Sequence, residues 1–212
     1  MATEVEAKFL ADGPEPLAQL AAADRLGRAA LGPPQAFDEV DRYLDTDDGR
    51  LAAAGWACRL RERAGSIRVS LKGPPEPQPA AWLHHRPELE APATDSIDPG
   101  DWAPSEAREA VERLSEGLSL HERFRLIQRR TERSVELDGV PIGTLSLDVV
   151  SVRSGETDAG TLFAIELELM SADDGSSREA LAELADALAR FPGLEPDGRT
   201  KLEHALAMIA SR

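Results

Sequence analysis

Acidic and basic side chains alternate with apolar ones in the first stretch of the sequence, TEVEAKFL, which begins at Thr3. A two-residue period sends alternate side chains to opposite faces of a β-strand, so this stretch predicts a strand with one charged and one apolar face. The apolar face can pack against a core, whereas the charged face can meet either solvent or the wall of a charged cavity. The charged set is Glu4, Glu6 and Lys8, and the apolar set is Val5, Ala7 and Phe9.

The same alternation recurs in four later stretches. For any one of them taken alone, a solvated sheet face with cross-strand ion pairs is the simpler interpretation. Their combination favours a barrel whose charged faces point into a lumen, because helices elsewhere in the chain are available to cover the apolar outer faces. The recurring charged faces consist of Arg59, Arg61 and Arg63; of Arg68, Ser70 and Lys72; of Arg86, Glu88 and Glu90; and of Glu166 and Glu168.

A lumen with acidic and basic walls suits a ligand that carries both signs. Buried charges have to be paired or bound to ions, because their desolvation is costly. Arginine and lysine side chains would bind the oxygens of a polyphosphate, and glutamates would hold Mg²⁺ or Mn²⁺, which prefer carboxylate oxygen. The pattern therefore indicates a site for a polyphosphate together with divalent metal ions.

The elements that must position these residues follow from hydrophobic periodicity and turn signals. A helix is predicted over residues 14–31 and ends at Gly32, Pro33 and Pro34. Two further helices are predicted at the end of the chain, where capping-box spacings mark their starts: Ser176 with Glu179, and Thr200 with Glu203. Pro87 within the strand over 84–92 favours an edge or a bulge there. The further strands are predicted over residues 37–46, 55–65 and 66–73 (a hairpin turning at Ala64-Gly65), 124–137, 141–152 and 161–170, and a further helix over 104–118.

Composition bounds the remaining classes of function. The chain has 212 residues, 42% of them hydrophobic, and a net charge of −15, which argues against nucleic acid as a partner because phosphate binding needs a positive surface. The one cysteine, Cys58, excludes an intrachain disulfide and a cysteine-rich zinc site. Without a long apolar run or a signal-like N-terminus, we expect no membrane partner and a cytoplasmic location.

Because nothing marks a linker, residues 1–212 are predicted to form a single α+β domain, an eight-stranded antiparallel barrel with helices outside.

The order of the charged motifs resembles that of the CYTH, or triphosphate tunnel metalloenzyme, superfamily. EVEAKF is similar to its Glu-x-Glu-x-Lys signature, and the resemblance continues to about Leu206. The other matching stretches, in order, are VDRYLDT, GRLAAAGWACRLRER, VSLKG, RPELE, RRTER, LSLDVV, IELEL and RTKLEHAL. The resemblance implies an eight-stranded antiparallel tunnel that binds triphosphates with divalent metal.

Residue roles carried over from the resemblance fall into three sets. The register of the 124–137 strand is open, so either Arg129 or Arg130 could face the tunnel. The metal-binding set is Glu4, Glu6, Asp148, Glu166 and Glu168. The phosphate-binding set is Lys8, Arg59, Arg61, Lys72, Arg86, Arg129 or Arg130, and Lys201. The candidates for activating a water molecule are Glu88, Glu90, Glu166 and Glu168.

The sequence leads to the hypothesis of a Mg²⁺- or Mn²⁺-dependent triphosphatase that removes the terminal phosphate of inorganic triphosphate. Nucleoside triphosphates are the next substrates to consider, and the superfamily also includes adenylyl cyclase and thiamine triphosphatase activities. A non-catalytic polyphosphate-binding module is a further alternative, although the full acidic set favours an enzyme. Tyr43, Trp56 and Cys58 are expected to pack within the protein, and neither His84 nor His85 is expected to be catalytic. The sequence leaves open whether the protein is a monomer or a homodimer.

Overall fold

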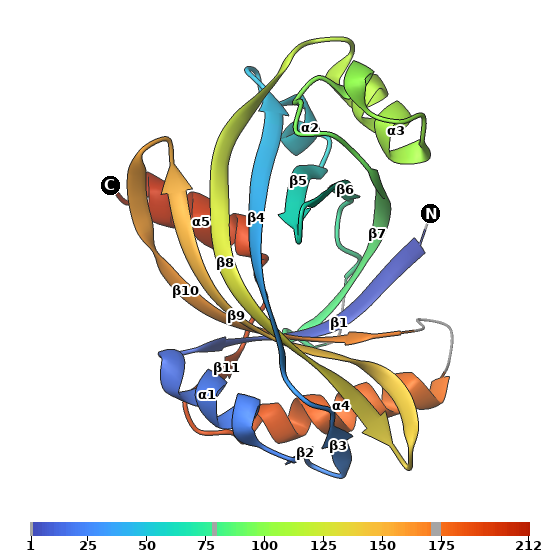
Figure 1. The fold of residues 1–212 in the computed structure, drawn as a ribbon, viewed down its shortest axis with the longest axis vertical. Helices are drawn as coiled ribbons and strands as arrows, with labels where there is room; N and C mark the ends of the chain where they lie inside the picture. The colour runs from blue at the N-terminus through green and yellow to red at the C-terminus, as the bar shows by residue number, and fades with distance from the viewer. Residues whose placement is uncertain (1, 78–79, 171–174) are drawn as a thin grey trace.

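Residues 2–77, 80–170 and 175–212 are described by the computed structural model, in which strands enclose a hollow centre and helices lie outside (Figure 1). The strands are β1 (Ala2–Ala11), β2 (Arg25–Leu26), β3 (Ala29–Leu31), β4 (Gln35–Thr46), β5 (Ala57–Arg63), β6 (Ser66–Lys72), β7 (Leu83–Pro92), β8 (Leu120–Leu137), β9 (Val140–Ser154), β10 (Thr157–Leu169) and β11 (Leu194–Pro196). The helices are α1 (Pro14–Ala22), α2 (Arg50–Ala53), the 3₁₀ turn η1 (Pro99–Asp101), α3 (Glu106–Ser115), α4 (Gly175–Ala189) and α5 (Lys201–Ala210).

Eight of the described strands close into an antiparallel barrel, as predicted. The order around the barrel is β4-β5-β6-β7-β1-β10-β9-β8, and β8 pairs back with β4. Two-residue turns with positive φ join neighbours where the sequence supplies glycine, at Ala64-Gly65 between β5 and β6 and at Asp138-Gly139 between β8 and β9. Closure leaves none of the eight strands with an unpaired edge.

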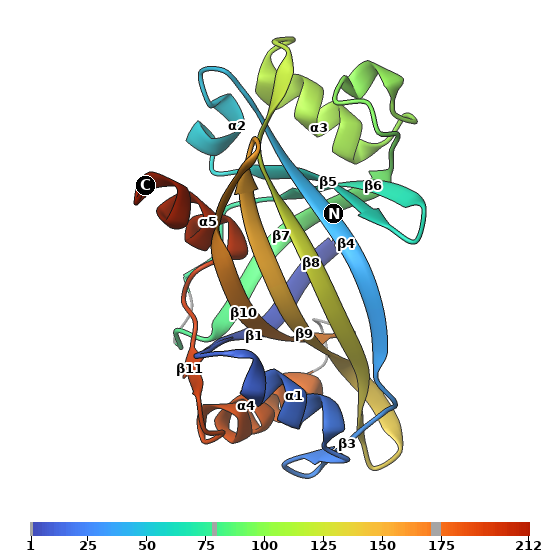
Figure 2. The ribbon, with the colours of Figure 1, turned by 60° about the vertical axis from the view of Figure 1, so that its left-hand side comes forward.

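Two apolar layers cover the outside of the barrel. The outer faces of β1, β9 and β10 pack under α1 and α4, with Val5, Ala7 and Phe9 buried there. The outer faces of β5, β6 and β7 pack under α2 and α3 around Trp102 and Leu60. Figure 2 shows these helix pairs at opposite ends of the barrel. The alternation in β1, β5, β6, β7 and β10 is thereby explained, because the apolar faces of these strands lie under the helices.

The C-terminal helix α5 covers inner faces instead of outer ones. The charged inner faces of β8, β9 and β10 become apolar toward one end of the barrel, where Leu126, Val150 and Leu162 are buried. Leu202 and Ala205 of α5 pack against this apolar stretch. The helix therefore fills one part of the barrel interior and brings its first residue, Lys201, beside the charged part.

Four local expectations can be compared with the structure: two are wrong, one is confirmed, and one concerns a side chain outside the described residues. The helix predicted over 14–31 ends at Ala22, because Gly27 adopts a positive φ of 56° and turns the chain into the short β2–β3 hairpin. The strand with Pro87 is neither an edge nor bulged at that residue. Pro87 lies opposite Thr3 of β1, but its carbonyl accepts from the Gly73 N–H on the β6 side, so its missing N–H also faces that side. The last β6–β7 pair, Lys72 with Glu88, ends just before it, and the missing N–H therefore leaves both ladders intact. The capping box at Thr200 is confirmed. The Ser176 side chain lies outside the described residues.

Candidate active site in the barrel

A cavity of about 520 Å³ occupies the charged part of the barrel. Of the described residues that line it, nine are basic and six are acidic. The basic ones are Lys8, Arg59, Arg61, Arg63, Arg68, Lys72, Arg86, Arg130 and Lys201, and the acidic ones are Glu4, Glu88, Glu90, Glu132, Glu166 and Glu168. Most of the residues predicted to bind phosphate therefore do converge on one hollow.

The acids Glu4, Glu6 and Glu168 gather where β1 pairs with β10. Glu6 lies directly opposite Glu168 in the antiparallel ladder. Glu168 is open to the cavity, yet partial desolvation and the charges of Glu4 and Glu6 raise its pKa to about 7. Neighbouring carboxylates repel one another unless a cation lies between them. We call Glu4, Glu6 and Glu168 the acidic wall.

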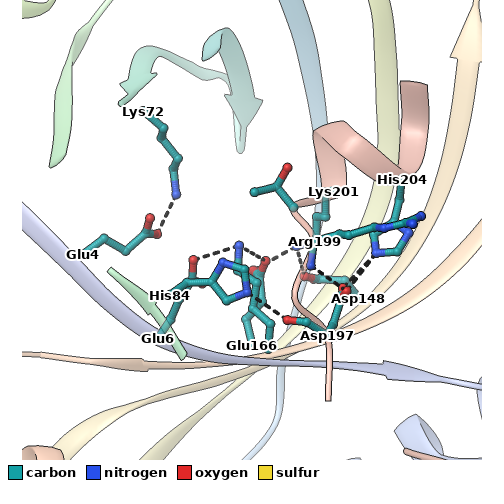
Figure 3. Close-up of polar contacts among 12 residues, drawn as sticks. Glu4, Glu6, Lys72, His84, Asp148, Glu166, Asp197, Arg199, Lys201 and His204 are labelled. Carbon is teal, nitrogen blue, oxygen red and sulfur yellow. Dashed lines mark hydrogen bonds and ion pairs between the residues drawn. The ribbon is translucent and has the colours of Figure 1, made fainter. Parts of the chain in front are cut away.

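Lysines and arginines neutralise part of the acidic wall. Glu4 binds Lys72 Nζ at 2.5 Å (Figure 3) and Arg86 Nε at 3.0 Å. Burial would raise the pKa of Glu4, but these cations together with Lys8 hold it well below its usual range. Glu6 contacts Lys8 Nζ at 2.9 Å, although its Oε1 accepts no hydrogen bond of good geometry among the described residues.

Asp148 and Glu166 form the deepest part of the site. Asp148 is fully buried and binds Arg130 through two hydrogen bonds of 2.8 and 2.7 Å and Lys201 Nζ at 2.6 Å. Glu166 shares both cations, at 2.8 Å to Arg130 and 2.9 Å to Lys201. Burial opposes the ionisation of both acids, but Lys201 and Arg130 outweigh it and lower both pKa values. Both carboxylates are therefore held ionised and pointed at the same two cations.

The opposite side of the cavity is basic and lies on β5. Asp41 of β4, with no exposed surface, accepts two 2.7 Å hydrogen bonds from Arg61 and one of 3.1 Å from Arg59. Arg63 binds Glu132 through two bonds of 2.7 Å and also contacts Glu39 at 3.2 Å. We call Arg59, Arg61 and Arg63 the basic wall. Each of its guanidinium groups has a carboxylate partner, which fixes its direction.

Three members of this network were missed from the sequence, since Glu39, Asp41 and Glu132 were assigned no role; Arg63 was placed on a charged strand face but not among the phosphate-binding residues. The signal of β4 was present, because Glu39, Asp41 and Tyr43 alternate as the inward residues of the other strands do. One apolar residue and one arginine lie between them and make the alternation harder to recognise. The structural role of the three acids is to hold the arginines of β5 and β8.

The register of β8 is settled by its pairing with β9. Arg130 lies opposite Asp148 and faces the cavity, whereas Arg129 lies opposite Val149 and is exposed. Arg129 instead pairs with Asp38 at 3.0 Å on the outer surface. Of the two alternatives that the sequence left open, the structure therefore places Arg130 in the cavity and Arg129 outside it, because a one-residue shift reverses every side chain of the strand.

Glu88 and Glu90 line the cavity on β7. Glu88 accepts a 2.6 Å hydrogen bond from Ser70 Oγ and lies 3.5 Å from Lys72 Nζ. Glu90 lies 3.4 Å from Arg68, and both of these side chains are considerably exposed. The two residues thus lie in the more open part of the cavity, away from the Asp148–Glu166 pair.

The residues expected to be structural lie largely where packing places them. Trp56 does not line the cavity and packs against Gly73. Tyr43 lines the cavity but is stacked on Phe124, with ring centroids 4.7 Å apart. Cys58 is buried, and burial with nearby Asp45 raises the pKa of its thiol to about 12. His84 is buried inside the barrel, where burial and Lys8 lower its pKa and its Nε2 donates to the Asp197 carbonyl at 2.8 Å.

The acidic wall fits a divalent metal in its chemistry. Carboxylate oxygens are the ligands that Mg²⁺ and Mn²⁺ prefer. Desolvation and then the charges of Glu4 and Glu6 raise the pKa of Glu168, and a cation beside these carboxylates would offset their repulsion. In the present side-chain arrangement, no three acidic, histidine or cysteine side chains among the described residues converge to ligand distance. Glu4 and Glu6 are turned instead toward Lys72, Arg86 and Lys8.

The fold is a closed antiparallel barrel with a charged, ion-paired interior. This combination defines a class of proteins that hold their ligand or substrate inside a tunnel. The sequence profile of the CYTH domain matches residues 2–205, and the chain belongs to this family. No protein of curated function matches the chain in sequence. Among the described residues, no helix is both long and apolar enough to cross a membrane.

Solved structures with the same fold cover nearly the whole chain. A candidate adenylyl cyclase from Hippeastrum, described as having a dominant triphosphatase activity, is similar with a TM-score of 0.68 and 21% identity, covering 96% of this chain and 95% of that one. A candidate adenylate cyclase from Bacillus halodurans gives 0.63 and 20%, covering 96% and 98%. The PH1819 protein of Pyrococcus horikoshii gives 0.59 and 21%, with the same coverage. At these identities the likeness establishes the fold alone.

Proposed function

We propose that this chain is a divalent-metal-dependent triphosphatase that cleaves the terminal phosphate from inorganic triphosphate. The observation that carries the proposal is the convergence of nine cations and six carboxylates on one cavity. The cations of such a site would bind the oxygens of a multiply charged anion, and the acids that remain among them would bind metal ions carried by that anion. A triphosphate with bound metal ions has this mixed charge.

The basic residues would bind the phosphate oxygens. Arg59 and Arg61 are held by Asp41, and Arg130 and Lys201 by Asp148, so their donors are already oriented before the substrate arrives. Donors fixed in advance stabilise developing charge without reorganisation at the moment of reaction. Lys8, Lys72 and Arg86 complete the phosphate-binding set from the side of the acidic wall.

The acidic wall, Glu4, Glu6 and Glu168, would hold the metal, with Asp148 and Glu166 as further candidate ligands. When bound, Mg²⁺ or Mn²⁺ would neutralise phosphate charge and make a bound water more acidic. Lys72, Arg86 and Lys8, now paired with the wall, would be released toward the phosphates. Binding would therefore exchange the partners of these side chains. The metal would replace Lys72, Arg86 and Lys8 at the carboxylates, and the triphosphate would replace the carboxylates at these three cations.

Among the four candidates for proton acceptor, Glu88 and Glu90 are favoured, because they line the cavity outside the acidic wall and would stay free of the metal. The pKa of Glu168 is raised to about 7 while no cation lies beside it, and a bound metal ion would lower it. Glu166 is instead held ionised by Lys201 and Arg130 and is suited to orienting these cations. The water oxygen bonds to the terminal phosphorus as the bond to the bridging oxygen breaks, and the water proton passes to the carboxylate.

Inorganic triphosphate is preferred over nucleotides and thiamine triphosphate because the cavity lining offers no free aromatic surface. Tyr43 is the one aromatic residue among the described residues of the lining, and its ring is already stacked on Phe124. Trp56, which could have stacked on a base, packs against Gly73 instead. Adenylyl cyclase activity is the second candidate, supported by the description of the Hippeastrum and Bacillus halodurans proteins as candidate cyclases.

A phosphate-release panel tests the proposal. Purified protein is incubated with inorganic triphosphate, ATP, thiamine triphosphate or long-chain polyphosphate, each with Mg²⁺, with Mn²⁺ or with a chelator, and products are identified by phosphorus NMR. We expect orthophosphate and pyrophosphate from triphosphate, only with metal, and faster than from the other substrates. Cyclic AMP and pyrophosphate from ATP would support the cyclase. Tight binding of triphosphate without turnover would support a binding module and overturn the proposal.

A further inference from the structure

Asp197 joins two strands of the barrel to the helix that carries Lys201. Its backbone N–H donates to the Lys8 carbonyl of β1 at 2.9 Å, and its carbonyl accepts from His84 Nε2 of β7 at 2.8 Å. Its carboxylate accepts from the Arg199 backbone N–H at 2.9 Å and from His204 Nε2 of α5 at 2.9 and 3.0 Å. Figure 3 shows these contacts meeting beside Lys201.

The place of this junction makes it more than a surface turn. Asp197 is 9% exposed, and the histidine partners come from opposite directions, one from inside the barrel and one from α5. Lys201 follows four residues later, with its Nζ 2.6 Å from Asp148 and 2.9 Å from Glu166. Leu194–Pro196 pairs with β1 just before the junction, so the path of the chain into the barrel is defined on both sides.

We propose that Asp197, with His84 and His204, is a positioning residue that holds Lys201 at the Asp148–Glu166 pair. The proposal rests on the proposed function, since the purpose of this placement is to present Lys201 to a phosphate group. His84 and Lys8 fix the backbone of Asp197 to the barrel, and the carboxylate fixes the start of α5. Lysine is a flexible side chain on a four-carbon stem, so the direction of its backbone decides where the ammonium group can reach.

A double-mutant cycle on Asp197→Ala and Lys201→Ala tests the proposal with inorganic triphosphate and Mg²⁺. Misplacement of a binding group by about 1 Å can cost about 100-fold in rate, so we expect Asp197→Ala to lower kcat/KM by about 10- to 100-fold. In the Lys201→Ala background the same change should cost less than about 2-fold, because the group that it positions is gone. Equal losses in both backgrounds would overturn the proposal.

Matched variants separate positioning from general stability. Asp98→Ala removes a similar side-chain bond, from the Gly100 N–H at 2.8 Å, at an exposed turn far from the cavity, and should leave kcat/KM unchanged. Should Asp197→Ala fail to fold, Asp197→Asn, which keeps one acceptor oxygen, and His204→Ala enter the same cycle. In His84→Gln the amide N–H can still donate to the Asp197 carbonyl, as the imidazole N–H does. This variant should therefore lose less kcat/KM than His84→Ala, and equal losses of kcat/KM would count against the role of His84.

A crystal structure of Asp197→Ala decides the question independently of activity. We expect the Lys201 ammonium to have left Asp148 and Glu166, while the barrel and the Arg130–Asp148 pair are unchanged. A Lys201 that keeps both contacts would overturn the proposal even if triphosphate is hydrolysed. If the wild type hydrolyses no triphosphate while the Asp197→Ala variant shows the displacement, the proposed function is overturned and the positioning role of Asp197 stands.

Discussion

The two walls of the cavity solve the problem of buried charge in opposite ways. On the basic wall, Asp41 is shared by Arg59 and Arg61, so cations are in excess around a buried acid. On the acidic wall, Glu6 faces Glu168 across a strand pair, and the pKa of Glu168 is raised to about 7. The basic wall is therefore complete without a ligand in its internal pairing. On the acidic wall, Lys72, Arg86 and Lys8 pair with Glu4 and Glu6, whereas no ion pair of Glu168 is found among the described residues. This difference supports our proposal that phosphate binds at the first wall and metal at the second.

Removal of two carboxylates from the acidic wall should give the largest effect. In the double variant Glu4→Gln and Glu6→Gln, the shape is kept but both charges are lost, so we expect metal-dependent phosphate release to fall at least about 1000-fold, as when a principal electrostatic contributor is removed. The rate is measured across a Mg²⁺ and a Mn²⁺ titration. Full rate in this variant would refute the assignment of metal to this wall.

Breaking the internal pairing of the basic wall should reduce stability. Asp41→Asn leaves Arg59 and Arg61 without their shared counter-charge inside the barrel, and loss of one partner of a buried ion pair costs about 3–5 kcal/mol. Urea unfolding measures the free energy of unfolding, with Asp38→Asn, on the exposed outer surface of the same strand, as the control. A loss of less than about 1 kcal/mol would mean that the basic wall is not the self-contained unit described above.

The pH dependence of stability should distinguish the walls more finely. Because the folded protein raises the pKa of Glu168 from 4.5 to about 7, it binds more protons there than the unfolded chain between these values, and this contribution to stability falls as pH rises. His84, with a lowered pKa, acts in the opposite direction. The informative quantity is therefore the difference between the wild type and Glu168→Gln.

That difference is measured by urea unfolding at pH 5 and pH 8 in the presence of a chelator. We expect Glu168→Gln to gain stability relative to the wild type on going from pH 5 to pH 8. Added Mg²⁺ should reduce the gain, because it supplies the wild type with the missing charge. A difference that is constant with pH would remove the evidence for charge crowding on the acidic wall.

The smallest effect is expected outside both walls. Arg129→Ala removes an exposed ion pair with Asp38, and such pairs contribute about 0–1 kcal/mol. Triphosphate hydrolysis should be unchanged, whereas Arg130→Ala should impair it strongly. Phosphate release from the two variants under identical conditions makes the comparison. Similar losses would indicate that β8 is paired in the other register in solution.

The sequence was sufficient to predict the barrel and most of the charged interior because one physical rule governs both. Strands with an apolar outer face and a charged inner face alternate with a period of two, and this period is visible in Glu4, Glu6 and Lys8 as clearly as in the structure. The helices were predicted from their own hydrophobic periodicity and turn signals, and their position outside the barrel from the apolar strand faces that need a cover.

The features that could not be predicted from the sequence depend on pairing between distant strands. The choice between Arg129 and Arg130 rests on which residue lies opposite Asp148, and Asp41 becomes recognisable only when Arg59 and Arg61 of the next strand are placed beside it. Likewise the helix predicted over 14–31 was wrong beyond Ala22, because pairing of Ala30 with Glu136 favours an extended chain over local helix propensity. Such contacts have no local signature.

The position of β1 in the barrel has a consequence for synthesis. This strand is the first of the described strands to leave the ribosome, yet its ladder partners β7, β10 and β11 follow at residues 83–92, 157–169 and 194–196. Contacts between parts so far apart in sequence form slowly, and a nascent chain must keep its unpaired strands from aggregating until then. Glu4 and Glu6 therefore belong to an incomplete barrel until the strands at residues 157–169 and 194–196 have been synthesised. The charges of Glu4, Glu6 and Lys8 keep this strand hydrated during that interval.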